Sequence, residues 1–414
     1  MNHPSSIVRL PLYHEEKMLG SNGNTIQQKN RALILRMLRD NREMSRVEIA
    51  SRTGLKKATV TIIISDLLET GIIESGGYLE TEVGRKAQSL HIAHDRFYVI
   101  AVKFSHSHYS IGLFDFCSEC LMLQRYTMPD GLLLEDVAEL LANHLKPMIA
   151  VLGSKAMAIG VGYELVSLNM WNDASMSVAN VREVFQDRME TLCGIPVLCN
   201  RNMFFSAYRW RHLNSNNLAM STVLSISVNS SVQAFLQAAN SYIILGKQQF
   251  AGSIGRIPVT VDNSKAALVL DDLLSTDAIV QQVIDARQQY PDSMLYQHSN
   301  IQVEHVIDAY YLCDPLARFV YNRALKQLGN LLSAFINLLN PDCIVLSGKL
   351  PYCKEALDAI YETATMNILP MTQVHINFYY PNTQSRQTNL DPVLSGISEN
   401  ISNQCIRNIM IDKL

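Results

Sequence analysis

The chain has 414 residues, a net charge of −3 and a hydrophobic share of 48%. A chain of this length is too long to fold around one small hydrophobic core, so we expect two or three domains. No apolar run reaches the roughly 20 residues that a membrane-spanning helix needs, and the first residues lack the basic-then-apolar order of a signal peptide. These features exclude a membrane protein and predict a cytoplasmic one.

Charge is distributed unevenly along the chain. Residues 17–61 hold ten Lys or Arg and three acidic residues, which is a net +7 and leaves −10 for the remainder. A basic segment on an acidic body is typical of a phosphate-binding module joined to a domain that does not touch nucleic acid. A solvated helical face gives the same count, so charge alone does not decide between the two.

The first part of the chain has the order of a helix-turn-helix. Residues 1–22 show no periodicity and are predicted to form a flexible arm, and residues 23–95 a winged helix-turn-helix domain with its linker. Apolar residues at helical spacing predict a first helix over about residues 26–40. Ser45 and Glu48 have the spacing of a capping box, which predicts that a second helix begins at Arg46.

This second helix is predicted to end at Thr53, with Val47, Ile49 and Ala50 facing the core. Gly54 then supplies the left-handed residue of a tight turn. A third helix follows over about residues 57–70, and its buried stripe is Val60, Ile63, Ile64, Leu67 and Leu68. Its start presents Lys and short hydrogen-bonding side chains, which suit phosphates and base edges.

A wing is predicted after the third helix. Residues 72–80 have the pattern of a strand, a Gly76-Gly77 turn and a second strand. Arg85 follows on a loop beside Gly84, where it can enter a narrow minor groove; an ordinary basic linker is the alternative. The residues predicted to contact DNA are Arg46, Arg52, Lys56, Lys57, Ala58, Thr59, Thr61, Arg85 and Lys86.

Further along the chain the pattern changes to that of an α/β domain. The predicted elements are strands over 97–104, 109–116 and 121–126, a helix over 133–151 and a strand over 156–162. Three antiparallel strands, a helix and another strand are typical of the start of an actin-like or hexokinase-like ATPase domain.

Eight cysteines are scattered along the chain, as expected for free thiols in a reducing compartment. Cys117 and Cys120 have CxxC spacing, but zinc normally takes four ligands and no second pair completes the set. The sequence therefore predicts a turn with two incidental thiols, no metal site and no cofactor.

Over about residues 25–400 the chain resembles the ROK family of repressors and sugar kinases, specifically its repressor branch. The helix-turn-helix precedes Gly84-Arg85-Lys86, where the family has a Gly-Arg-Pro-like linker. Residues 251–256 stand where the family has Ala-Gly-Glu-Ile-Gly-His, and residues 338–348 resemble its late Asn-Pro-strand-Gly-Gly segment. The resemblance implies a two-subdomain body, with residues 96–199 and 380–414 in one subdomain and residues 200–379 in the other.

The chain departs from the family's kinases at their catalytic motifs. The first phosphate loop of the kinases, Asp-x-Gly-x-Thr, corresponds to a stretch that starts at Lys103 and holds neither Asp nor Gly. Asn200 is kept, but the position of the catalytic Asp holds Arg201, a permanent cation that cannot act as a base. The second phosphate loop corresponds to residues 227–231, whose side chains would obstruct close backbone approach to phosphate.

The family's zinc cluster is also missing from the sequence. No Cys follows Arg256 before Cys313, and Arg256 itself stands where the family has its zinc-binding His. Ser253 replaces the Glu that recognises sugar in the family. The resemblance therefore predicts no sugar phosphorylation and no catalytic residue.

We predict a DNA-binding transcriptional regulator, by resemblance a repressor, that binds a double-stranded operator as a homodimer or homotetramer. By resemblance, the cleft that binds substrate in the family's kinases would be lined here by Asn200, Arg201, Ser253 and Arg256. Two Arg residues there favour an anionic effector, or else they brace a collapsed cleft. A residual sugar kinase, and a regulator controlled by a protein partner without a small ligand, are the open alternatives.

Overall fold

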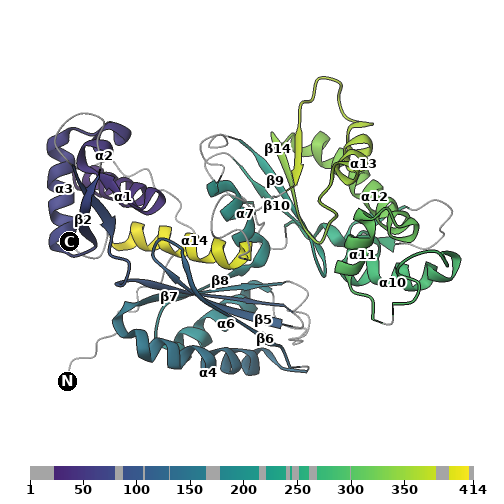
Figure 1. The fold of residues 1–414 in the computed structure, drawn as a ribbon, viewed down its shortest axis with the longest axis horizontal. Coiled ribbons are helices and arrows are strands. Elements are labelled where there is room, and N and C mark those ends of the chain that lie inside the picture. Colours follow the sequence, from purple (N-terminus) through teal and green to yellow (C-terminus); the bar gives the residue numbers. More distant parts are fainter. Residues whose placement is uncertain are drawn as a thin grey trace. The chain divides into compact units, whose positions relative to one another are not determined.

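The computed structural model divides into two compact units, Met1–Arg209 with Ser385–Leu414, and Trp210–Gln384 (Figure 1). The predicted boundaries of domains and subdomains stay predictions. None of the described helices is long and apolar enough to cross a membrane. The structure describes residues 23–79, 87–105, 108–129, 131–164, 178–213, 221–238, 243–244, 251–260, 268–298, 300–378 and 391–409.

The first unit begins with a headpiece of three helices and a small sheet, as predicted. The helices are α1 (Gly23–Asn41), α2 (Arg46–Thr53) and α3 (Lys57–Glu69). The sheet has the order β1-β3-β2, with β1 (Met44–Ser45), β2 (Ile73–Leu79) and β3 (Ala87–Ile92).

Local capping fixes where α2 starts and stops. The Ser45 hydroxyl accepts a hydrogen bond from the Glu48 N–H at 3.2 Å, and Gly54 takes the left-handed conformation at φ 69°. Val47, predicted to face the core, is 60% exposed. That prediction was wrong because Val47 lies two residues before Ile49, which places it on the opposite side of the helix.

The wing differs from its predicted form. β2 continues through Gly76 and Gly77, and its register with β3 shifts between Ser75 and Tyr78. The two glycines therefore form a bulge within a strand and not the hairpin turn. The second wing strand is β3, so residues 80–86 connect the two wing strands; Arg85 and Lys86 belong to this connection, outside the described residues.

The body of the first unit is a five-stranded sheet of order β6-β5-β4-β7-β8. β4 pairs antiparallel with β5 and parallel with β7, in agreement with the predicted order of elements. Its elements are β4 (Tyr98–Phe104), β5 (His108–Asp115), β6 (Cys120–Thr127), α4 (Leu134–Leu152), η1 (Gly153–Lys155), β7 (Ala156–Tyr163), α6 (Val178–Cys193), β8 (Val197–Arg201), α7 (Asn202–Leu213) and α14 (Pro392–Ile409).

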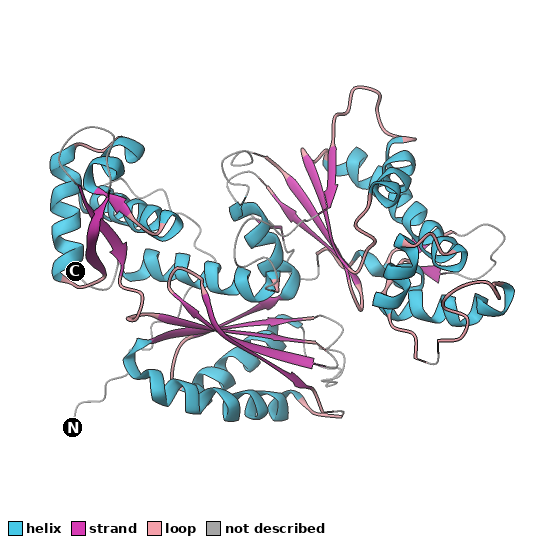
Figure 2. Cartoon of the chain, in the orientation of Figure 1, coloured by secondary structure: helices cyan, strands magenta, loops and turns pink. Residues whose placement is uncertain are grey.

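Helices cover both faces of this sheet (Figure 2). Ile159 and Val161 of β7 join α4 and α6 in one apolar core. Gly160 and Gly162 alternate with them and face the other side. A side chain at Gly160 would collide with Ile397 of α14, and one at Gly162 with the Asn202 side-chain oxygen. The C-terminal helix therefore packs directly on the sheet backbone.

The second unit has its own five-stranded sheet, of order β11-β10-β9-β14-β15, and a separate two-stranded one. The long helix α12 lies at the centre of its apolar core. The elements are β9 (Val223–Val228), β10 (Val232–Gln237), β11 (Ile243–Ile244), η4 (Ile254–Arg256), β12 (Pro258–Val259), β13 (Leu268–Val269), α9 (Asp271–Leu274), α10 (Thr276–Ala286), η5 (Arg287–Gln289), α11 (Val303–Tyr311), α12 (Pro315–Leu339), β14 (Cys343–Gly348), α13 (Lys354–Thr365) and β15 (His375–Phe378).

Candidate nucleic-acid interface

The helix α3 has one buried face and one solvent face. Val60, Ile63, Ile64 and Leu67 are buried, while Leu68, predicted with them, is half-buried. On the other face Lys56, Lys57, Ala58 and Thr61 are exposed and Thr59 is half-buried. The residues predicted to contact DNA on this helix are thus accessible at its first turns.

The N-terminus of α3 is electrostatically suited to an anion. Its first turn contains no acidic residue, so the positive end of the helix dipole adds to Lys56 and Lys57 without local compensation. The Thr61 hydroxyl donates to the Lys57 carbonyl at 2.9 Å. The oxygen lone pairs and methyl group of Thr61 are therefore what it can offer to a base.

The two arginines of α2 differ in their surroundings. Arg46 is exposed at the first position of the helix. Arg52 pairs with Glu48 at 2.7 Å and donates to the Asn41 side chain at 2.8 Å. Arg52 braces α2 against the end of α1, and binding a phosphate would require it to give up these contacts.

Two exposed side chains were missed by the sequence analysis. Ile62 on α3 is 58% exposed, and Tyr78 on the wing strand β2 is 70% exposed. Ile62 follows Ala58 by four residues, so it shares the solvent face with the predicted contacts. That spacing was visible in the sequence, but a hydrophobic residue in a hydrophobic run is assigned to the core by default.

The end of β8 carries two of the predicted effector residues in the first unit. Asn200 and Arg201 are each 3% exposed, and the Asn200 side-chain oxygen accepts from the Arg201 N–H at 2.8 Å. Within the described residues the Asn200 amide nitrogen has no hydrogen-bond partner, and neither has the Asn202 amide oxygen. Buried polar atoms without partners are rare in folded proteins.

The other two predicted effector residues belong to the second unit. Ser253 is half-buried and Arg256 is exposed, beside the short turn η4. Burial raises the pKa of Asp271, and its backbone hydrogen bond from Val232 and the nearby Arg256 cation act in the opposite direction. The Asp271 carboxylate accepts from the Val232 N–H at 2.7 Å, which ties the start of α9 to β10.

Described residues make internal contacts in both stretches that the resemblance aligns with kinase phosphate loops. The Lys103 ammonium group pairs with the Asp391 carboxylate at 2.6 Å within the first unit. In the second unit the Asn229 amide donates to the Ser227 hydroxyl at 2.8 Å, at the end of β9.

Family models match both parts of the chain. A model of the ROK family matches residues 99–380, which is more than half of the chain. A model described as winged helix-turn-helix DNA-binding matches residues 28–74. The second match coincides with the headpiece from α1 to the start of β2.

Curated relatives span most of the chain. The DNA-binding transcriptional dual regulator NagC of Escherichia coli strain K12 is 22% identical over 348 residues, 81% of this chain and 84% of the relative. A putative xylose repressor of Caldicellulosiruptor sp. is 22% identical over 339 residues, 78% of this chain and 84% of the relative.

Solved structures share the fold. A ROK family transcriptional regulator, described as a homolog of the E. coli MLC protein, matches with a TM-score of 0.71 and 18% identity, over 93% of this chain and 99% of that one. A ROK family glucokinase from Streptomyces griseus, in complex with glucose and AMPPNP, matches with a TM-score of 0.56 and 16% identity. This match covers 74% of this chain and 99% of the glucokinase chain. The predicted fold class, a winged helix-turn-helix followed by an actin-like body, is confirmed.

Proposed function

The chain belongs to the ROK family and carries a winged helix-turn-helix headpiece, and from this we propose that it is a transcriptional repressor that binds double-stranded DNA. The observation that carries the proposal is the first turn of α3, where Lys56 and Lys57 stand exposed at a helix N-terminus without an acidic neighbour in that turn. Two relatives support a regulatory function, one named as a DNA-binding transcriptional dual regulator over 81% of this chain and one as a putative xylose repressor over 78% of it.

Each group in the interface has its own role in this proposal. Lys56, Lys57 and Arg46 bind backbone phosphates, which sets affinity and position. Ala58, Thr59, Thr61 and Ile62 face base edges in the major groove, where methyl groups meet the thymine methyl and hydroxyls meet polar base atoms. Arg85 and Lys86, which lie between the two wing strands in sequence, bind the minor groove of the DNA. Two copies of the chain bind two half-sites.

A gel shift with DNA from upstream of the protein's own gene tests this function. The double variant Lys56→Ala/Lys57→Ala should bind this DNA, and unrelated DNA of equal length, more weakly than the wild type. The matched control is Lys155→Ala/Lys354→Ala, which removes two exposed lysines of the body and should bind as the wild type does. Equal binding by both double variants contradicts the proposed interface.

The absence of sugar kinase activity is part of the proposal. Arg201 stands at the position of the catalytic carboxylate, and Lys103 and Asn229 are engaged inside the two former phosphate loops. An assay that couples ADP release to a visible signal, run with a panel of hexoses and amino sugars, should give no turnover above a protein-free control. Phosphoryl transfer to any of these sugars would contradict it.

In this proposal the first unit binds a small anionic effector at Asn200 and Arg201, at the end of β8. The expectation from the sequence that Ser253 and Arg256 also bind it stays a prediction. The unpartnered amide nitrogen of the buried Asn200 supports a ligand there, because such a donor is costly to leave unsatisfied. A sugar phosphate that binds should raise the melting temperature of the wild type by mass action and that of Asn200→Ala less. A body controlled by a protein partner alone would show no such rise with any small anion.

A further inference from the structure

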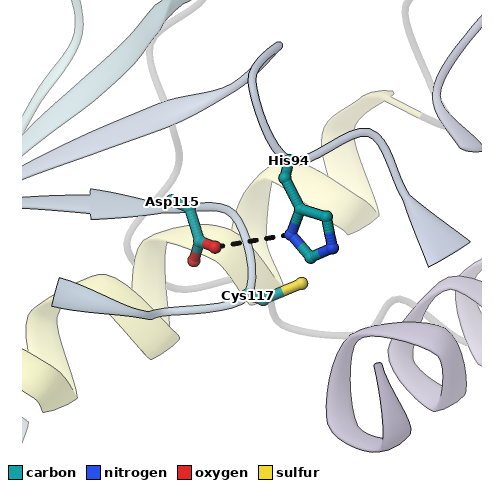
Figure 3. Close-up of side chains that lie close together, drawn as sticks. All are labelled: His94, Asp115 and Cys117. Atoms are coloured by element: carbon teal, nitrogen blue, oxygen red, sulfur yellow. Dashed lines mark ion pairs between the residues drawn. The ribbon is translucent and has the colours of Figure 1, made fainter. Parts of the chain in front are cut away.

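Three side chains with metal-binding atoms come together in the first unit, away from the residues discussed above. They are His94, Asp115 and Cys117, whose ligand atoms all lie within 4.8 Å of one another. Figure 3 shows the three pointing toward a common space, His94 from the segment that follows β3 and the others from the end of β5. His94 Nδ1 and Asp115 Oδ2 are 3.6 Å apart.

The strand pairing explains why residues distant in sequence meet here. β4 begins shortly after His94, and its first residue Tyr98 lies opposite Asp115 in β5. Cys117 follows in the turn to β6, where Ser118 takes a left-handed conformation at φ 62°. The turn with free thiols was predicted, and both Cys117 and Cys120 are free. Its proximity to His94 was not predicted.

Hydrogen bonds and ring stacking fix the directions of two of the donor groups. Asp115 Oδ1 accepts from the Glu119 N–H at 2.7 Å, which leaves Oδ2 to face His94. The His94 ring stacks on the His91 ring, with centroids 5.5 Å apart and an angle of 16°. In metal sites, contacts from residues around the ligands orient the ligand atoms in this way.

We infer that His94, Asp115 and Cys117 bind a divalent transition-metal ion of the zinc class. Imidazole nitrogen, thiolate sulfur and carboxylate oxygen are the donors that zinc takes, and at its usual bond lengths tetrahedral ligand atoms lie about 3.3 to 3.8 Å apart. The three ligand atoms lie within 4.8 Å of one another, so side-chain rotation about χ1 and χ2 can bring them to this spacing. A water molecule supplies the fourth ligand, since His94 is half-exposed.

Burial disfavours the charged forms of two of the three groups. The Asp115 side chain is only 6% exposed, and its burial raises the pKa of its carboxyl group. Burial, with the carboxylate of Asp115 adding to it, raises the pKa of the Cys117 thiol to about 12, and the nearby cations of Arg42 and Arg39 act in the opposite direction. A bound cation offsets both costs; binding converts the thiol into a thiolate and releases its proton to solvent.

The site lies where the headpiece joins the body. His94 stands between the last wing strand β3 and the first body strand β4. In the same turn as Cys117, the Glu119 carboxylate pairs with Arg42, just after α1, at 2.6 Å. A metal ion held by His94 and the β5–β6 turn therefore fixes the segment that leads from the headpiece to the body.

Cobalt absorption tests the site directly. The full chain, freed of metal with a chelator, is titrated with Co²⁺ alone, which gives a near-ultraviolet thiolate-to-metal band when a Cys is a ligand. The wild type and the control Cys120→Ala should show the band at about one equivalent, Cys117→Ala should lack it, and Asp115→Asn should bind at least about tenfold more weakly. A band kept by Cys117→Ala, lost in Cys120→Ala or missing from the wild type overturns the inference.

A second measurement uses only the wild type, so it does not depend on how a variant folds. Added Zn²⁺ should slow the alkylation of Cys117 by iodoacetamide, followed by mass spectrometry of its peptide, and leave the rate at Cys120 unchanged. Equal rates at Cys117 with and without Zn²⁺ overturn the inference. Neither measurement involves DNA, so failure here is distinct from failure of the proposed repressor function.

Discussion

Two isoleucines on the same helix allow the headpiece to be tested by a matched pair of substitutions. Ile64 is fully buried and Ile62 is 58% exposed, both on α3 and two residues apart. Truncation of a buried Ile to Ala leaves a cavity and costs about 2–5 kcal/mol, whereas an exposed substitution stays within about 0.5 kcal/mol. Ile64→Ala should therefore destabilise the headpiece, and Ile62→Ala should weaken DNA binding while the headpiece keeps its stability.

Hydrogen exchange of the full chain measures this difference locally, without assuming that several domains unfold together. Peptides from α2 and α3 should exchange about 30-fold faster or more in Ile64→Ala and at the wild-type rate in Ile62→Ala. Peptides from the β9–β14 sheet should not change in either variant. Equal acceleration by the two substitutions, or a larger effect of Ile62→Ala, would refute the assignment of the two faces of α3.

Two further predictions concern the turn and the former catalytic position. In Gly54→Ala the new methyl group meets no neighbouring atom, but an L-residue is forced to φ 69°. The substitution should lower the free energy of unfolding of the headpiece by about 1–2 kcal/mol, which is measured as faster exchange of the α2 amides. An unchanged exchange rate would contradict the strained turn. Arg201→Asp places a carboxylate where the resemblance puts the catalytic Asp of the kinases. This variant should still give no sugar phosphorylation in the coupled assay, because the Lys103–Asp391 and Asn229–Ser227 contacts remain in the stretches aligned with the phosphate loops. Turnover by this variant would contradict that reasoning.

Local signals in the sequence predicted the headpiece well. The hydroxyl of Ser45 and the left-handed Gly54 set the ends of α2, and each acts within a few residues. The same local signals misplaced the wing, because a Gly-Gly pair fits a bulge as well as a turn. The pairing of β2 with β3 distinguishes the bulge from the turn, and β3 begins only after the seven undescribed residues 80–86.

Contacts between distant parts of the chain could not be predicted. Lys103 and Asp391 are 288 positions apart, and nothing near either residue indicates the other. The CxxC spacing drew attention to Cys117 and Cys120, whereas the structure brings Cys117 to His94 and Asp115 through the register of β4 and β5. A sequence pattern indicates which residues share a face of one helix or strand. The register of a sheet decides which residues of different strands lie side by side.

The salt dependence of DNA affinity tests the central claim, that α3 binds DNA through its first turn. Fluorescence anisotropy with DNA from upstream of the gene gives the slope of log affinity against log salt concentration for the wild type and for Lys56→Ala/Lys57→Ala. If each lysine neutralises one phosphate, the double variant should lose about 1.8 from the magnitude of the slope for each copy of the chain bound. A variant slope equal to that of the wild type would contradict the account.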